Sequence, residues 1–334
     1  MSKKLLVGLG LAGALGGYHF YIEHSGCTYK GEENLKGQAF ILTGATNPGI
    51  GKETARELAK RGAKVILAAK NQDRCHQARQ HIMHSTKYAN HDVDCADLDL
   101  KSLKSVRKFV DELPADLQLK GLINAAETVK KHRREETHDG LEKQMGVSHF
   151  GHFLLTNLLV EKYGRSSPFR VTAVTYPAGS VEMRMEDLNS VKSYDRDRVY
   201  RQAKLATLYT IYSAAFQVGA FPVRFFAVNP GPSNTEVFRH VCGDKSFIIK
   251  VLLQPLLMFL FPSAEKAAQP ILYTALSPQL DNLSGSYVEN CTPKEMPIGN
   301  RDLVQAKRLW QISQEVVADP KAFVAAAEKA KTEA

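Results

Sequence analysis

The sequence predicts a single α/β domain built on a doubly wound, mostly parallel β-sheet. Three observations lead to this prediction. Short apolar segments alternate with helical segments, the first apolar segment ends in a glycine-rich turn, and no repeat or low-complexity linker divides the 334 residues. Apolar strands that alternate with helices pair in parallel and are covered on both faces.

The expected strands are short and apolar, and longer helical segments fill the gaps between them. We expect strands at 39–43, 64–69, 93–98, 121–124, 169–174 and 223–228. We expect helices at 52–60, 71–85, 102–111, 141–159 and 200–216. With 44% hydrophobic residues, the chain can build a substantial core.

The composition excludes some classes of protein and leaves others open. The formal net charge of +9 fits a negative membrane surface, a phosphorylated cofactor, nucleic acid or simply a solvated basic surface. No zinc finger, RNA-binding signature or long basic arm is present, so we do not expect nucleic-acid binding. The five cysteines show no CxxC or metal-ligand spacing, which predicts reduced, mostly buried thiols and no metal site.

The N-terminus carries an apolar segment that is just long enough to cross a membrane. Lys3 and Lys4 precede a run from Leu5 to Ile22 that contains five glycines. We expect an uncleaved anchor, with a cleaved signal peptide as the alternative. The two lysines favour a cytosolic N-terminus, although lysines on the far flank leave the orientation open. The expected segments are an anchor at 1–23, a linker at 24–36, the α/β domain at 37–318 and a helical tail at 319–334.

The turn after the first expected strand has the composition of a dinucleotide-binding loop. It reads Thr43-Gly-Ala-Thr-Asn-Pro-Gly-Ile-Gly51, with a strand before it and a helix after it. Glycines let the backbone turn tightly and approach a pyrophosphate, whose charge is favoured at a helix N-terminus. Lys52 follows this turn and Lys70 ends the second strand, where lysines suit the 2′-phosphate of NADP(H). The alternative is that both lysines belong to a generally basic surface.

Further motifs follow in a fixed order along the chain. They are Gly49–Ala55, Leu98–Arg107, Gly151–Leu159, Tyr200-x-x-x-Lys204, Pro230-Gly231 with Thr235, Tyr273–Pro278, Ser284–Tyr287 and Lys307–Trp310. From about residue 37 to residue 317 the chain therefore resembles the short-chain dehydrogenase/reductase family, and within it the retinol dehydrogenase branch of the 11 to 14 type. The resemblance implies a Rossmann-type fold, an N-terminal membrane anchor, and hydride transfer between NADP(H) and a retinoid, steroid or lipid carbonyl or alcohol.

The resemblance also implies roles for individual residues. Tyr200 would transfer the proton at the substrate oxygen, while Lys204 would lower the pKa of that tyrosine and hold the nicotinamide ribose. A serine that fixes the substrate oxygen and an asparagine that supports a water relay complete the family's site. The matching cofactor-binding positions are Gly44, Gly49, Ile50, Gly51, Lys52, Lys70, Asp99, Leu100, Asn124, Lys204, Pro230, Gly231 and Thr235.

Several positions depart from the family pattern where the chemistry takes place. Tyr176 stands at the serine position, and we expect its ring to fill space intended for substrate. The short hydroxyl of Thr175 points to the other face of the strand unless a bulge shifts the register. Ser148 replaces the asparagine, Glu127 puts an anion where a glycine backs the cofactor, and the longer phosphate turn contains Pro48. We therefore expect weakened or lost catalysis, with an active membrane-bound oxidoreductase as the alternative.

Two further segments bear on partners and location. The basic run 130–134 predicts a solvated loop, or else a site for an anionic partner or lipid head group. The apolar segment 247–261 is too interrupted for a confident membrane span, and the family implies a substrate lid there. His240 and Cys242 beside it are not expected to bind metal. We expect a small hydrophobic substrate or lipid and an endoplasmic reticulum membrane, with a lipid droplet or mitochondrial membrane as alternatives. The resemblance also implies dimer contacts through the helices near Leu141 and Tyr200.

Overall fold

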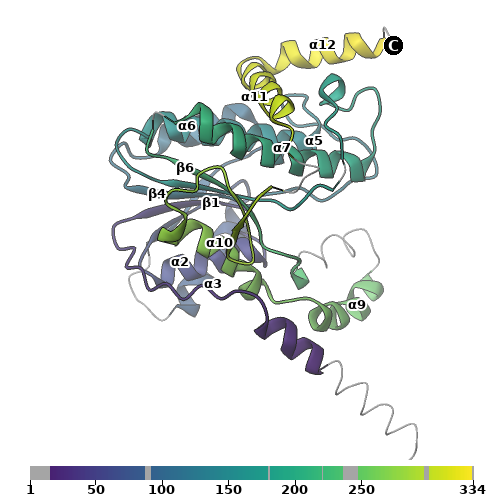
Figure 1. Ribbon diagram of the computed structural model, residues 1–334. Coiled ribbons are helices and arrows are strands. Elements are labelled where there is room, and N and C mark those ends of the chain that lie inside the picture. Colours follow the sequence, from purple (N-terminus) through teal and green to yellow (C-terminus); the bar gives the residue numbers. More distant parts are fainter. Residues whose placement is uncertain are drawn as a thin grey trace, which may run out of the picture.

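An eight-stranded sheet lies at the centre of the molecule, with helices on both of its faces (Figure 1). The computed structural model describes residues 16–86, 92–179, 181–219, 221–235, 247–296 and 301–332. The strand order is β3-β2-β1-β4-β5-β6-β7-β8, and only the β7–β8 pair is antiparallel. The strands are β1 (Ala39–Thr43), β2 (Lys64–Ala69), β3 (Val93–Asp97), β4 (Leu119–Asn124), β5 (Arg170–Val174), β6 (Arg224–Asn229), β7 (Tyr287–Glu289) and β8 (Thr292–Lys294).

The helices form one layer on each face of the sheet (Figure 1). One layer contains α2 (Ile50–Lys60), α3 (Gln72–Ser85) and α10 (Ala264–Leu276). The other contains α4 (Leu103–Glu112), α5 (Lys143–Met145), the π-helical turn η1 (Gly146–Gly151), α6 (His152–Tyr163), α7 (Arg196–Gln217) and α11 (Leu303–Ala318). The described chain also contains a helix at residues 16–24, helices α9 (Phe247–Leu260) and α12 (Pro320–Thr332), and the short 3₁₀ turns η2 (Met185–Asp187) and η3 (Pro278–Leu280).

Strand β1 shows why the sequence forms a sheet that is covered on both sides. All five of its residues are buried. Successive side chains point to opposite faces, so Phe40 and Leu42 enter one apolar core while Ala39 and Ile41 enter the other. The strand order reverses between β1 and β4, and open α/β sheets bind ligands at the carboxyl ends of the strands beside such a reversal. This topology places the candidate site at the ends of β1, β4 and β5.

The sequence-based prediction of a single α/β domain on a parallel sheet is confirmed. The six predicted strands and five predicted helices are present, with their ends shifted by a few residues. The prediction did not include the β7–β8 pair, whose strands have three residues each. Over the described residues, no helix has both the length and the apolar character needed to span a membrane, and most of the apolar run from Leu5 lies outside them.

The prediction of reduced thiols is wrong for four of the five cysteines. Cys27 is bonded to Cys291, and Cys75 is bonded to Cys95, with Cα atoms 5.7 and 5.9 Å apart. The first bridge joins residues 264 positions apart, so no local spacing in the sequence could reveal it. It ties the segment before β1 to the β7–β8 turn, while the second bridge ties α3 to β3. Cys242 lies outside the described residues.

Helix α11 packs along α7 and joins the C-terminal part of the chain to the domain. The rings of Trp310 and Phe153 meet edge to face at 4.9 Å, and His149 Nε2 lies 2.7 Å from Ser313 Oγ. Burial lowers the pKa of His149 to about 3, so this imidazole is neutral. Helix α11 lies along α7 and therefore covers part of α7. A homodimer through α6 and α7 stays a prediction.

Acidification should destabilise the protein through His149. The folded-state pKa is about 3 and the unfolded value is 6.5, so between these values the unfolded chain binds a proton that the folded chain does not. The free energy of unfolding therefore rises with pH across this interval, by up to about 1.4 kcal/mol per pH unit. Denaturant unfolding at several pH values should show a flatter dependence for His149→Gln. The exposed control His81→Gln should follow the wild type, and equal slopes for all three proteins would contradict this role of His149.

Candidate active site

Helix α7 carries the two residues that the sequence analysis assigns to catalysis. Tyr200 and Lys204 lie about one helical turn apart, so their side chains leave the same face of the helix. Both residues are buried, and Lys204 Nζ lies 5.5 Å from the centroid of the Tyr200 ring. Asp195 caps the N-terminus of this helix by accepting the backbone N–H of Arg198, which fixes where the helix begins. The structure thus brings the phenol and the amine together.

A carboxylate from the loop after β4 lies between these two groups. Glu127 Oε2 accepts a hydrogen bond from Lys204 Nζ at 2.9 Å and one from Tyr200 OH at 3.3 Å. The Lys204 and Glu127 side chains are only 6% and 9% exposed, so water screens this ion pair poorly. The sequence predicts an anion near the cofactor at this position. Only the fold reveals that the same carboxylate binds both the tyrosine and the lysine.

The loop that presents Glu127 is held by a hydroxyl at the end of β1. Thr43 Oγ1 accepts the backbone N–H groups of Ala125 and Ala126, each at 3.1 Å. It also lies 2.9 Å from His152 Nε2, while Nδ1 of that ring lies 3.2 Å from a backbone carbonyl in η1. Burial lowers the pKa of His152 to about 4, so the ring is neutral and Nδ1 donates to the carbonyl, leaving Nε2 to accept from Thr43. This network joins residues 109 positions apart, so no local pattern in the sequence predicts it.

Tyr176 lies beside Tyr200, as expected from its position at the end of β5. The two ring centroids are 5.7 Å apart, and Lys204 Nζ lies 5.6 Å from the centroid of the Tyr176 ring. The aromatic ring thus takes up space next to the candidate catalytic phenol. The hydroxyl of Thr175 is buried and donates to the backbone carbonyl of Lys204 at 3.1 Å. Thr175 therefore does not replace the missing serine in this structure.

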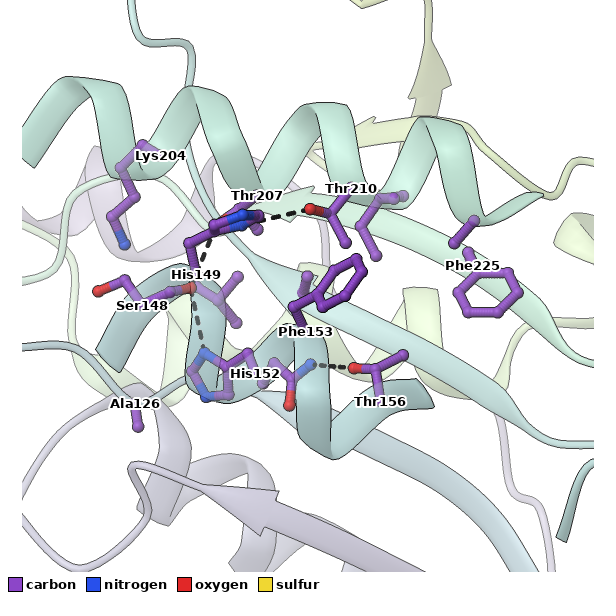
Figure 2. Close-up of a pocket in the computed structure, with 15 residues that line it drawn as sticks. Ala126, Ser148, His149, His152, Phe153, Thr156, Lys204, Thr207, Thr210 and Phe225 are labelled. Atoms are coloured by element: carbon purple, nitrogen blue, oxygen red, sulfur yellow. Dashed lines mark hydrogen bonds between the residues drawn. The ribbon is translucent and has the colours of Figure 1, made fainter. Parts of the chain in front are cut away.

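Ser148 and Asn124 border a small cavity behind Lys204 (Figure 2). The cavity has a volume of about 20 Å³, which is enough for one water molecule. The Ser148 hydroxyl and the Asn124 side-chain carbonyl are buried and have no hydrogen-bond partner among the described protein atoms. Figure 2 shows Lys204 and Ser148 toward one end of the cavity and Phe225 at the other. The polar end is suited to holding one water where the family's asparagine would support a relay.

The glycine turn before α2 leaves no room for side chains at two positions. Gly44 has φ +76°, and a Cβ atom there would lie 2.5 Å from the carbonyl oxygen of Ala125. A Cβ atom on Gly51 would lie 2.6 Å from the carbonyl oxygen of Gly44. Gly49 precedes α2 without a side-chain cap, so the first N–H groups of α2 face the turn. This arrangement suits a phosphate group at the helix N-terminus.

The other sequence-predicted cofactor positions lie at the carboxyl ends of the strands. Ile50 and Lys52 are in the first turn of α2. At the end of β2, Lys70 Nζ donates to Asp99 Oδ2 at 2.6 Å, and the Lys70 side chain is 59% exposed. Leu100, which follows Asp99, is buried in the apolar core. The lysine at the expected 2′-phosphate position is thus held in place by a carboxylate from the loop after β3.

The segment after β6 lies at the same edge of the sheet. Gly231 has φ +75°, and its N–H donates to Asn229 Oδ1 at 3.0 Å, which forms a tight turn around Pro230. The hydroxyls of Ser233 and Thr235 lie 3.3 Å apart in the next residues. The family pattern places the nicotinamide beside this segment. His240 and Cys242, which follow it in the sequence, lie outside the described residues.

The described residues suit the adenosine half of a dinucleotide better than its nicotinamide half. The side-chain-free turn, the uncapped helix α2 and the Lys70–Asp99 pair can hold an adenosine diphosphate with a 2′-phosphate. At the nicotinamide end, Glu127 already binds the amine and the phenol that a ribose and a substrate would need. The residues therefore fit NADP(H) only if Glu127 gives up these contacts.

The basic loop 130–134 contributes a second cation at the site. Lys130 Nζ pairs with Asp197 at 2.7 Å and lies 4.6 Å from the centroid of the Tyr200 ring. Arg134 Nε donates to the backbone carbonyl of Asn189 at 2.9 Å. These contacts hold the ends of the loop against the domain, and Lys131 is half-buried, while His132 and Arg133 are exposed. The prediction of a solvated loop therefore holds only for those two residues.

Comparison with known proteins identifies the family. The model of the family described as short chain dehydrogenase matches residues 38–245. This chain belongs to the short-chain dehydrogenase family. The chain is 36% identical to retinol dehydrogenase 13 of Mus musculus over 301 residues, which cover 89% of this chain and 88% of that protein. It is 37% identical to retinol dehydrogenase 12 of Homo sapiens over 285 residues, which cover 85% and 87%.

Solved structures of the family show the same fold. An uncharacterized protein from Mycobacterium Paratuberculosis matches with a TM-score of 0.67 and 27% identity, over 88% of this chain and 98% of that one. An actinorhodin polyketide ketoreductase crystallised with NADPH matches with a TM-score of 0.55 and 14% identity, over 75% and 95%. At that identity the second match shows the fold alone. The resemblance to retinol dehydrogenases that the sequence indicated is confirmed by the matches to these relatives.

The buried ion pair between Lys204 and Glu127 predicts a measurable energetic coupling. Lys204→Met should lower the free energy of unfolding by about 3 kcal/mol, because the carboxylate is left buried without its cation. Glu127→Gln removes that charge, so the double variant should lose less stability than the sum of the two single variants. Denaturant unfolding of the four proteins gives the coupling energy. A value indistinguishable from zero would show that the two side chains do not pair in solution.

Proposed function

We propose that the protein is a retinol-dehydrogenase-like, NADP(H)-binding member of its family whose catalysis on retinoid or lipid alcohols and carbonyls is weakened or lost. The observation that carries the proposal is the contact of Glu127 with both Tyr200 and Lys204. An active oxidoreductase of the same type is the alternative. It draws support from the retained tyrosine and lysine and from the similarity to retinol dehydrogenases 12 and 13.

The retained groups define what the site would do with a bound cofactor. NADPH would supply the hydride, and the protein would supply the proton and the positioning. Tyr200 OH is the proton donor or acceptor at the substrate oxygen, and the cation of Lys204 favours its phenolate form. The cavity beside Ser148 and Asn124 would hold a water that connects Lys204 with the interior. These roles require the Lys204 amine to lie close to both the Tyr200 phenol and the nicotinamide ribose.

The charge of Glu127 works against each of these roles. A carboxylate at 2.9 Å from Lys204 offsets the cation that would stabilise a phenolate. The same carboxylate accepts from Tyr200 OH, the hydroxyl that a substrate oxygen would need. The ring of Tyr176 adds bulk at the position where the family has a serine. A cofactor must therefore displace a buried carboxylate before the site can be assembled.

The protein's surroundings are also part of the proposal. The N-terminal apolar run and the similarity to retinol dehydrogenases support attachment to a membrane, with the endoplasmic reticulum favoured over lipid droplets or mitochondria.

A helix at residues 16–24 lies against α9, since Tyr18 OH donates to the carbonyl of Leu260 at 3.4 Å and His19 stacks edge to face with Phe259. Exposed side chains of both helices, including Phe20 and Met258, give this region an apolar surface. Such a surface suits a membrane boundary and access for an apolar substrate.

Replacing Glu127 with the family's glycine should strengthen cofactor binding. Glu127→Gly should bind NADPH roughly tenfold more tightly or better, because the ribose no longer competes with a buried carboxylate. Turnover of retinaldehyde should become measurable and should disappear in the Glu127→Gly/Tyr200→Phe double variant. Titration calorimetry and an NADPH absorbance assay test both points, with the exposed Glu161→Gln as control. Efficient wild-type turnover that Tyr200→Phe abolishes would instead establish the active alternative.

The cofactor preference should depend on Lys70. Lys70→Ala should lower the affinity for NADPH by roughly tenfold and leave that for NADH unchanged, because only NADPH carries the phosphate that the amine would bind. Lys60→Ala, at the far end of α2, is the matched control for loss of a surface cation. Binding titrations of the Glu127→Gly parent, Lys70→Ala and Lys60→Ala with each cofactor, all in the Glu127→Gly background, give the six affinities. An equal loss for both cofactors would contradict a phosphate-binding role for Lys70.

A further inference from the structure

The two disulfides carry information about the compartment in which the domain folds. Stable disulfides form in oxidising compartments and are rare where thiols are kept reduced. Here Cys75 is fully buried and joins α3 to its neighbouring strand, and Cys27 joins the segment before β1 to the β7–β8 turn. Two independent pairs within bonding distance indicate that the domain folds under oxidising conditions.

The sequence also contains two acceptor motifs for N-linked glycans, both near β7. The motif Asn-x-Ser/Thr, with x not proline, marks such acceptors in secreted and lumenal proteins. It occurs at Asn282-Leu283-Ser284 and at Asn290-Cys291-Thr292. Both asparagines are exposed, in the turns that flank β7. A glycan on a turn at this edge of the sheet would project into solvent.

The first of the two motifs is the better acceptor. Asn282 lies in the turn after η3, and Leu283 and Ser284 beside it are also exposed. The Ser284 hydroxyl accepts the backbone N–H of Phe225 at 3.1 Å, a contact that leaves the exposed Asn282 side chain clear in the folded protein. The turn therefore satisfies the motif and leaves room for the sugar.

The second motif is engaged by the N-terminal segment. Asn290 Oδ1 accepts the backbone N–H of Cys27 at 2.6 Å, and Cys291 within the motif is bonded to Cys27. A glycan on the amide nitrogen of Asn290 would meet the segment that this bridge holds against the turn. The bond and the bridge together disfavour modification at Asn290.

The charges that flank the N-terminal apolar run do not decide which side of a membrane the domain faces. Lys3 and Lys4 precede the run, and Lys30 and Lys36 follow it, so the positive residues are balanced across it. The disulfides and the acceptor motifs are therefore the two separate observations that favour a lumenal domain.

We propose that the domain folds on the lumenal side of a secretory membrane and that Asn282 carries an N-linked oligosaccharide. The co-reactant is an oligosaccharide attached to a polyprenyl diphosphate. The amide nitrogen of Asn282 attacks C1 of the first sugar and loses a proton, the new N-glycosidic bond forms, and the C1–oxygen bond to the diphosphate breaks. The polyprenyl diphosphate leaves, and no oxidant or reductant is needed.

The full chain, with a C-terminal epitope tag and expressed in cultured animal cells, provides the test. On a denaturing gel the wild type should migrate as one oligosaccharide heavier than after treatment with peptide N-glycosidase. Asn282→Gln and Ser284→Ala should both migrate at the deglycosylated position, whereas Ser284→Thr preserves the motif and should keep the shift. Asn290→Gln should also keep it. A wild type that the glycosidase does not shift, or an Asn282→Gln variant that it still shifts, would overturn the assignment.

Thiol labelling of the same cells tests the compartment independently. A maleimide polymer added to the denatured chain should label one thiol before reduction and all five after it, because four of the five cysteines are paired. Cys75→Ala should expose its partner Cys95 and add one labelled thiol before reduction. Labelling of all five thiols without reduction would place the domain in a reducing compartment and overturn the proposal.

Discussion

The contact that organises the active site is the buried ion pair between Glu127 and Lys204. It joins the loop after β4 to helix α7 across the crevice where the strand order of the sheet reverses. Both side chains are more than nine-tenths buried, so neither charge can be left alone without a large desolvation cost. Whatever binds in this crevice has to replace the contact with another charge-compensating arrangement. The chemistry of the site therefore depends on whether a bound molecule can displace the Glu127 carboxylate from Lys204.

The surrounding residues hold that carboxylate in place. Thr43 accepts the two backbone N–H groups that precede Glu127, and the neutral His152 fixes the orientation of the threonine hydroxyl. Replacement of the family's serine by Tyr176 and of its asparagine by Ser148 alters the two other sides of the same crevice. The three changed residues therefore lie around the same crevice. The glycine turn, in contrast, keeps its close contact with the backbone after β4. Under the proposed function, the fold is preserved where it would bind the adenosine half and altered where hydride transfer would take place.

The sequence predicted the sheet and its helices well because these depend on local patterns. Buried parallel strands read as continuous apolar runs, and β1 and β2 have the predicted limits. The motif series also located Tyr200, Lys204 and the altered position Glu127. The prediction could not show that Glu127 binds both other residues, because 73 and 77 positions separate them and only the fold brings them together. The disulfide of Cys27 and Cys291 was missed for the same reason, since its partners are 264 positions apart.

A crystal structure of the wild-type protein grown with saturating NADPH would test the central claim most directly. The account predicts that the adenosine end lies on the glycine turn while Lys204 Nζ keeps its bond to Glu127, so that the nicotinamide ribose does not reach the amine. A structure in which the ribose hydroxyls bind Lys204 and Tyr200, with Glu127 turned away from both, would contradict it. That outcome would mean that the carboxylate yields readily to the cofactor and that the site is assembled for hydride transfer.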